Sequence, residues 1–150
     1  MPIVFVIGRV VFVLYFIFAG LQRLMNVTAS ADYFAQKFVI PTALAAAASQ
    51  VENLSGLSAP QMLAVLAGAI ELAAGLMIAF NVGTRAMAAV LVVFTGLGIY
   101  YGLNFWAMTA PGRDVALQQA MLHVSLIGGL LVFVALGYSR PGEPPRQIDV

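Results

Sequence analysis

The sequence predicts an all-α membrane protein, a four-transmembrane-helix bundle with a short interfacial helical segment between its first and second spans. Of its 150 residues, 62% are hydrophobic and only 9% are charged, whereas water-soluble domains carry about 25% charged residues. Four apolar stretches are also long enough to cross a bilayer, which takes about 20 helical residues. They are too long and too evenly apolar for the alternating strands of a membrane β-barrel.

The four predicted spans belong to one transmembrane domain, which we expect to occupy residues 1–138. A tail rich in proline and charge follows over residues 139–150. The spans themselves cover residues 3–24, 62–80, 86–106 and 116–138.

The segment between the first two spans is the long connection of the chain. Within it, residues 32–40 carry Phe34 and a second phenylalanine four residues later, and Pro41 follows them. This spacing predicts a short helix lying at the membrane interface and stopped by the proline. Ser58 is a candidate N-cap for the second span.

The orientation of the chain follows from its lysines and arginines, because these are enriched in cytoplasmic loops. Four spans place both termini on one side, with four basic residues against three on the other. We therefore expect an integral protein of the bacterial inner (cytoplasmic) membrane with cytoplasmic termini. The side of the termini holds Arg9, Arg85, Arg140 and Arg146, and the other side holds Arg23, Lys37 and Arg113.

Several classes of chemistry are excluded by composition. The chain has no cysteine, so it forms no disulfide and offers no thiol ligand to an iron–sulfur cluster or zinc. It has one histidine, so we expect no metal site and no bis-histidine haem within one chain. A net charge of +1 gives no basic surface for nucleic acid.

Glu71 is the most informative residue, because a carboxylate in the middle of a membrane span is costly and rarely lacks a partner or a role. It lies at the centre of a stripe of small residues, which lets membrane helices approach closely. We therefore expect Glu71 to face another helix, either in a structural ion pair or as an acid lining a pocket. A lipid-facing position is the remaining alternative. The stripe comprises Ala64, Gly68, Glu71, Gly75 and Ala79.

Arg9 and Arg23 are 14 residues apart in the first span, which places them within about 40° on one helical face. We predict that this face points inward. For each arginine the alternative is that its side chain reaches out to the membrane surface.

A further set of polar and aromatic residues approaches the half of the membrane that contains Arg23. His123 comes from the fourth span, and the others come from the end of the third span. The alternative roles are helix packing for the histidine and an interfacial aromatic belt for Tyr101 and Trp106. The set comprises His123, Tyr100, Tyr101, Asn104 and Trp106.

This predicted polar cluster has three possible uses, which the sequence leaves open. It could hold the bundle together, pass protons between Glu71 and His123, or bind the polar head of a lipid-soluble molecule such as a quinone. No catalytic residue can be assigned.

Several short segments, in this order and spacing, resemble the DoxX family of small four-helix membrane proteins. The resemblance extends from Gly8 to about Gly142. Two positions depart from the family pattern: Tyr100 to Leu103 lack its histidine before Asn-Phe-Trp, and Leu122-His123 replaces its Lys-Asn. The matching segments are residues 20–24 (GLQRL), 34–41, 71–75 (ELAAG), 83–85 (GTR), 104–106 (NFW), 118–119 (QQ) and 127–131 (IGGLL).

The resemblance implies a membrane component of redox complexes, some of which act in quinone-linked oxidation of sulfur compounds. We therefore expect a subunit of a larger redox assembly that shapes a quinone or lipid site or anchors partners in the bilayer. It has no recognisable electron carrier, so we expect no independent catalysis. The alternatives are a purely structural subunit and a small proton-coupled transporter, and homo-oligomers are compatible with the sequence.

Overall fold

The computed structural model describes residues 2–37, 49–50 and 52–136, and this part of the chain contains helices and no strand. Four helical segments within it are long and apolar enough to cross a membrane, which confirms the predicted fold class. They are α1 (Pro2–Met25), α4 (Ala59–Ala79), the continuous run of α5 (Thr84–Leu97), η1 (Gly98–Leu103) and η2 (Phe105–Ala107), and α6 (Gly112–Leu136). The predicted tail over 139–150 lies outside the described residues.

The segment after α1 is helical, but it differs from the predicted interfacial helix. The helix α2 (Val27–Lys37) begins directly after Asn26, five residues before the predicted start, and residues 38–40 lie outside the described part. Phe34 is buried on α4 against Ala64 and Ala67. This contact with α4 fixes the helix, while its position at a membrane surface stays a prediction.

The beginning of α4 is set by hydrogen bonds to its first amides. The Ser58 N–H donates to Gln61 Oε1 over 2.9 Å, and the Ala59 N–H donates to Glu52 Oε1 over 2.6 Å. Helices need such partners because their first amides have none within the helix. The prediction of Ser58 as the residue before this helix is confirmed.

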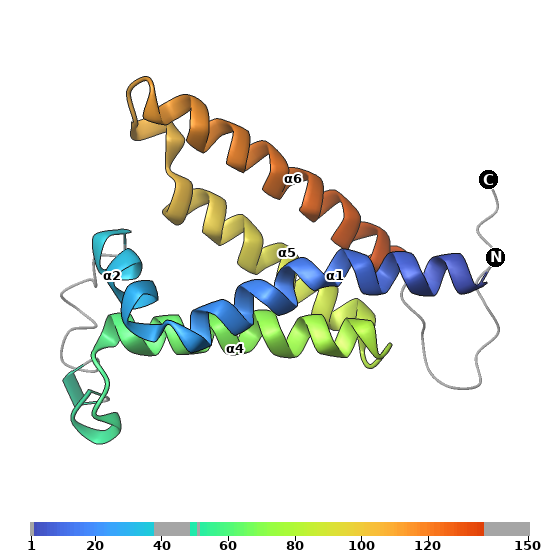
Figure 1. The fold of residues 1–150 in the computed structure, drawn as a ribbon, viewed down its shortest axis with the longest axis horizontal. Helices are drawn as coiled ribbons and strands as arrows, with labels where there is room; N and C mark the ends of the chain where they lie inside the picture. Colours follow the sequence, from blue (N-terminus) through green and yellow to red (C-terminus); the bar gives the residue numbers. More distant parts are fainter. Residues whose placement is uncertain (1, 38–48, 51, 137–150) are drawn as a thin grey trace.

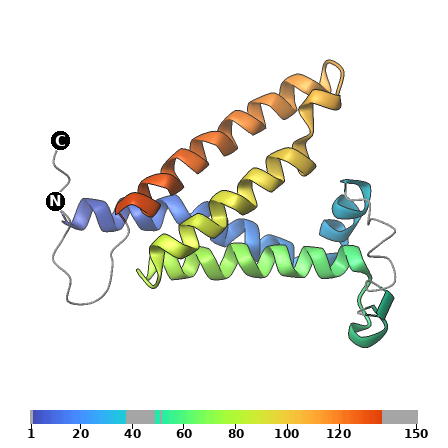
Figure 2. The same cartoon turned by 180° about the vertical axis from the view of Figure 1, so that it is seen from behind.

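The helices are arranged as two pairs. The first pair is α1 with α4, and the second is α5 with α6. The pairs meet near the start of α1 and diverge toward α2 (Figures 1 and 2). Within the first pair, a Cβ on Gly20 would lie 2.6 Å from the carbonyl oxygen of Gly68, so glycine at this crossing lets the two backbones approach closely.

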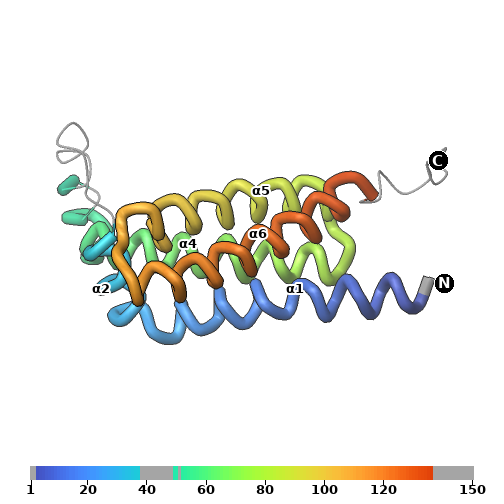
Figure 3. The backbone as a smooth tube through the Cα atoms, turned by 90° about the horizontal axis from the view of Figure 1, so that it is seen from above, coloured from blue at the N-terminus to red at the C-terminus, as the bar shows by residue number. Residues whose placement is uncertain are grey.

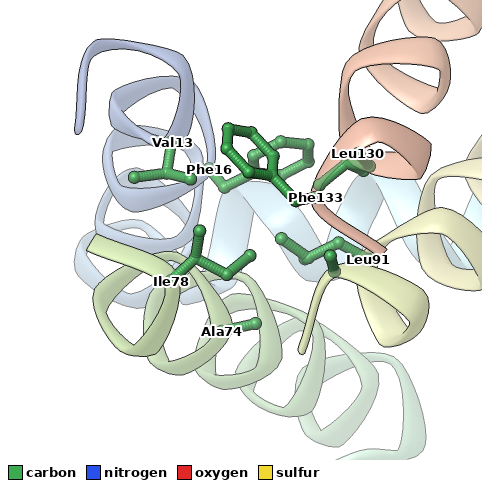
Figure 4. Close-up of a cluster of buried hydrophobic side chains, with 8 residues drawn as sticks. Val13, Phe16, Ala74, Ile78, Leu91, Leu130 and Phe133 are labelled. Carbon is green, nitrogen blue, oxygen red and sulfur yellow. The ribbon is translucent and has the colours of Figure 1, made fainter. Parts of the chain in front are cut away.

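The hydrophobic core occupies the region where all four spanning segments meet. Phe16 of α1, Ile78 of α4, Leu91 of α5 and Leu130 of α6 are each at most 1% exposed. Figure 4 shows their side chains pointing toward one another. Because the core fills only this region, the diverging ends of the helix pairs are left to enclose a space.

Candidate functional site

A cavity of about 680 Å³ lies between the two helix pairs, on the side of the molecule nearest α2. Its wall is mostly apolar. The apolar side chains include Leu63, Leu66, Ile70, Phe94, Leu97, Leu122 and Leu126. The polar side chains are Tyr15, Arg23, Tyr33, Gln119 and His123. A largely apolar pocket with a few polar groups on its wall is the usual form of a small-molecule site.

Arg23 and Glu71 form an ion pair beside this cavity. The Arg23 Nε donates to Glu71 Oε2 over 2.8 Å, and its Nη2 donates to Oε1 over 3.4 Å. Glu71 is 5% exposed, so its predicted position facing another helix is confirmed and a lipid-facing position is excluded. The Arg23 side chain is 30% exposed, because one side of it reaches the cavity while the other contacts the acid.

The guanidinium of Arg23 also contacts an aromatic ring from α2. Its Cζ lies 5.6 Å from the centroid of the Phe34 ring, a distance at which the ring face attracts a cation. Arg23 thus connects α1 to α4 through Glu71 and to α2 through Phe34. The cation is neutralised by one neighbour and oriented by the other.

A second polar group of the cavity connects α6 to α1. The His123 Nδ1 lies 2.7 Å from the Gln119 carbonyl oxygen, and its Nε2 lies 3.3 Å from the Tyr15 hydroxyl. A carbonyl oxygen can only accept, so Nδ1 carries the proton. In the neutral imidazole, Nε2 then accepts from Tyr15. The backbone of its own helix therefore orients the His123 ring and places a proton on Nδ1.

Tyr33 of α2 reaches across the cavity toward η1. A Cβ added to Gly102 would lie 2.6 Å from the Tyr33 hydroxyl oxygen, so the absence of a side chain at 102 lets the phenol approach this wall. Burial raises the pKa of Tyr33 above its ordinary value, and the positive Arg23 opposes this rise more weakly. Tyr33 is thus a neutral phenol that can donate a hydrogen bond.

The aromatic residues predicted at the end of the third span do not line the cavity. Tyr100, Tyr101 and Trp106 are exposed and contact one another, with ring centroids 4.8 Å apart for the two tyrosines and 5.3 Å apart for Tyr100 and Trp106. Asn104 ends η1 in the left-handed conformation, with φ of 39°. The expected convergence of these four residues with Arg23, Glu71 and His123 is therefore not observed.

These residues do not reach the cavity because the helical period changes near the end of the third span. The prediction treated residues 86–106 as one regular α-helix, but η1 is a π-helix, whose i→i+5 hydrogen bonds widen the turn. The wider turn places Gly98, Gly102 and Leu103 on the cavity wall. It turns the two tyrosines away.

Arg9 is inward-facing as predicted, but it does not join this site. It is 9% exposed, and its Nη1 donates to Asn81 Oδ1 over 2.7 Å. Asn81 belongs to the turn between α4 and α5, at the end of the bundle opposite α2 (Figure 1). The two arginines share one face of α1 but lie four turns apart along it, so only Arg23 reaches Glu71.

Three of the polar cavity residues were not anticipated from the sequence. Tyr15 precedes Arg23 by eight residues and Gln119 precedes His123 by four, so helical spacing could have placed both on the cavity face. Tyr33 had no comparable signal, because its place depends on how α2 packs against α4.

Comparison with known proteins identifies relatives of the chain. The DoxX family profile matches residues 4–102, more than half of the sequence. The chain is also similar to Inner membrane protein YphA of Escherichia coli strain K12, with 23% identity over 136 residues that cover 91% of this chain and 84% of the relative. No solved structure matches.

Proposed function

Because the chain belongs to the DoxX family of membrane proteins, we propose that it is the membrane subunit of a larger redox assembly and holds the polar head of a quinone in its cavity. The observation that carries this proposal is the cavity of about 680 Å³ between the helix pairs. Its volume lies within the range of about 300–1,000 Å³ for small-molecule sites.

The polar side chains of the cavity fit a neutral ligand with hydrogen-bond acceptors. Glu71 neutralises Arg23, and the described residues that line the cavity include no other arginine, lysine or carboxylate. Tyr33, Gln119 and the exposed edge of Arg23 offer donors. Quinone carbonyls accept hydrogen bonds, and the apolar wall suits the ring and the start of its isoprenoid tail.

We also propose a membrane and a partner for the chain. The relative in Escherichia coli is an inner membrane protein, and we assign this chain to the same kind of membrane with its termini in the cytoplasm. The chain supplies no recognisable electron carrier, so electrons would pass between the quinone and a partner subunit. In this scheme the chain positions the quinone and anchors the partner.

The first test isolates the protein in mild detergent, extracts quinone and identifies co-purifying proteins. The purified protein is then placed in lipid nanodiscs and titrated with a short-chain quinone. We expect extracted quinone, a redox partner and saturable binding. A protein that carries no quinone and binds none when it is added contradicts the proposal.

A matched pair of glycine substitutions makes this test specific to the cavity. Gly98 lines the cavity, and a Cβ at either Gly98 or Gly96 would meet nothing within 4 Å. Gly98→Leu should therefore fill part of the cavity without strain and weaken quinone binding about tenfold or more. Gly96→Leu should bind as the unaltered protein does. Equal binding by both variants would place the ligand elsewhere.

A further inference from the structure

A polar groove of about 1000 Å³ lies in the corner between α1 and α2. α2 leaves the end of α1 at an angle (Figures 1 and 3), and the described residues that line this outer groove all belong to α1, α2 or the turn between them. It is more polar than the cavity, because amide, hydroxyl and phenol groups lie beside a guanidinium. These polar side chains are Tyr15, Gln22, Arg23, Asn26, Ser30 and Tyr33.

The outer groove and the cavity share three side chains. Tyr15, Arg23 and Tyr33 line both of them, so a layer of side chains stands between the two spaces. Arg23 is held in this layer by its ion pair with Glu71. The two tyrosines are the side chains of the layer that can turn aside.

Each of these tyrosines spans the gap between the helix pairs. The Tyr15 hydroxyl lies 3.3 Å from His123 Nε2, beyond the distances of about 2.7–3.2 Å that are usual for hydrogen bonds between nitrogen and oxygen. The Tyr33 hydroxyl meets η1 at Gly102, where there is no side chain. Both tyrosines are exposed, at 45% and 42%. Exposed side chains change rotamer within nanoseconds, so both rings can rotate and join the two spaces without moving a helix.

One face of α1 leads along the bilayer to the outer groove. Val11, Leu14 and Phe18 are exposed and follow one another at steps of three and four residues, so they form an apolar stripe on one helical face. Gln22 continues this face four residues later and lines the groove. The face is therefore apolar first and polar at its end, which matches an amphiphile whose tail lies in the bilayer.

We infer that the outer groove is the entry site through which an uncharged, lipid-soluble ligand passes from the bilayer into the cavity. The tail of the ligand lies along the apolar stripe of α1, and its head accepts hydrogen bonds from Gln22, Ser30 and Arg23. The ion pair uses Nε and Nη2 of Arg23, so Nη1 is left for the head. Tyr15 and Tyr33 then turn aside and admit the head to the cavity.

The charges of the outer groove favour an uncharged head. Arg23 is its cation and is already paired with Glu71, and the described residues that line the groove include no carboxylate. A quinone is an uncharged amphiphile of this kind. That the ligand is a quinone rests on the proposed function, whereas the route itself does not.

The experiment measures how fast an amphiphile reaches the cavity of the full-length protein. The chain has no cysteine, so Ala67→Cys places a single thiol at a position that lines the cavity and is 5% exposed. The protein in lipid nanodiscs is treated with a long-chain N-alkyl maleimide, which carries two carbonyl acceptors on an apolar tail. Mass spectrometry follows the labelling.

A matched pair of second substitutions tests the route. Ala29 and Ala35 are exposed alanines of α2, and of the two only Ala29 lines the outer groove. We expect Ala29→Phe to slow labelling about tenfold and Ala35→Phe to leave it unchanged. Ala19→Phe fills the groove from α1 and should act as Ala29→Phe does. In protein unfolded with SDS, all variants should label at one rate.

The rival route enters through the apolar wall of the cavity, where Leu66, Leu97 and Leu122 are exposed. Equal labelling rates with Ala29→Phe and Ala35→Phe would favour this rival and overturn the inference. A thiol at position 67 that stays unlabelled without a second substitution would also overturn it.

Quinone binding to the same variants separates the route from the proposed function. Filling the groove should slow binding and release equally and leave the Kd unchanged, because a route affects rates and not the bound state. Absent quinone binding with slowed maleimide labelling would contradict the proposed function alone. Normal quinone binding with unchanged labelling would contradict the route alone.

Discussion

At the scale of single residues, the role of Glu71 is set by its ion pair with Arg23. The carboxylate is buried, and its hydrogen bonds with the guanidinium connect α4 to α1 within the membrane-spanning part of the bundle. A charge in this position is tolerated because it is paired and hydrogen-bonded. The same pair holds Arg23 at the cavity wall, so the packing of α1 on α4 and the polar lining of the cavity depend on one interaction.

The substitution Glu71→Gln separates these two roles. It keeps the shape of the side chain but leaves the charge of Arg23 uncompensated, which should lower the free energy of unfolding by about 1–3 kcal/mol. If the cavity holds quinone, quinone-coupled turnover of the assembled complex should also fall. The measurements are unfolding in detergent and turnover per assembled complex.

The rival role makes a different prediction for the same variant. If the chain is only a structural subunit, Glu71→Gln should reduce the yield of the complex and leave turnover per complex unchanged. Unchanged turnover in a normally assembled complex would therefore count against the proposed quinone site.

At the scale of helices, the α1–α4 pair depends on close backbone approach. A Cβ on Gly68 would lie 2.9 Å from Leu24 Cγ, and one on Gly20 would lie 2.6 Å from the Leu72 amide nitrogen. Attraction between membrane helices comes mainly from packing, so small residues at this crossing are needed for the pair to form. The Arg23–Glu71 ion pair is adjacent to this crossing.

We predict that Gly20→Ala destabilises the protein by about 1–3 kcal/mol, because the added methyl group has to move backbone atoms of α4. Gly8→Ala is a matched control in the same helix, since a Cβ at Gly8 would meet nothing within 4 Å. Unfolding of both variants in the same detergent gives the comparison. Equal stabilities would mean that the two backbones can separate at little cost.

At the scale of the whole molecule, the divergence of the two helix pairs divides the bundle. The half near the start of α1 contains the core of Phe16, Ile78, Leu91 and Leu130, while the half near α2 contains the cavity. The exposed surface is rich in large apolar side chains, which is expected for helices that face lipid. The cavity is thus formed by helices whose outer faces remain in the bilayer.

The orientation in the membrane can be tested because the sequence has no cysteine. Single substitutions Val82→Cys, in the α4–α5 turn, and Thr109→Cys, between η2 and α6, probe opposite ends of the bundle. With cytoplasmic termini, an impermeant maleimide added to whole spheroplasts should label Thr109→Cys and leave Val82→Cys unlabelled until the cells are lysed. The reverse labelling pattern would contradict the prediction of cytoplasmic termini. The cysteine-free protein controls for background labelling.

The site residues whose inward positions could be predicted lie on regular α-helices. Arg9, Arg23 and Glu71 were assigned inward positions from spacing alone, and the structure agrees because α1 and α4 keep the α-helical period. Tyr100, Tyr101, Asn104 and Trp106 were expected to join them, and they do not, because the period changes at η1. A local change in helical period has no clear signal in one sequence.

The sequence by itself determined the membrane class, the four spans and the need of Glu71 for a partner, because these follow from the cost of placing polar groups in hydrocarbon. Only the tertiary structure decided which arginine pairs with Glu71, that Tyr15 meets His123, and that α2 brings Tyr33 to the cavity. The first contact depends on how α1 crosses α4, and the second depends on how far the helix pairs diverge. That divergence is set by packing between residues distant in the chain, which no local pattern encodes.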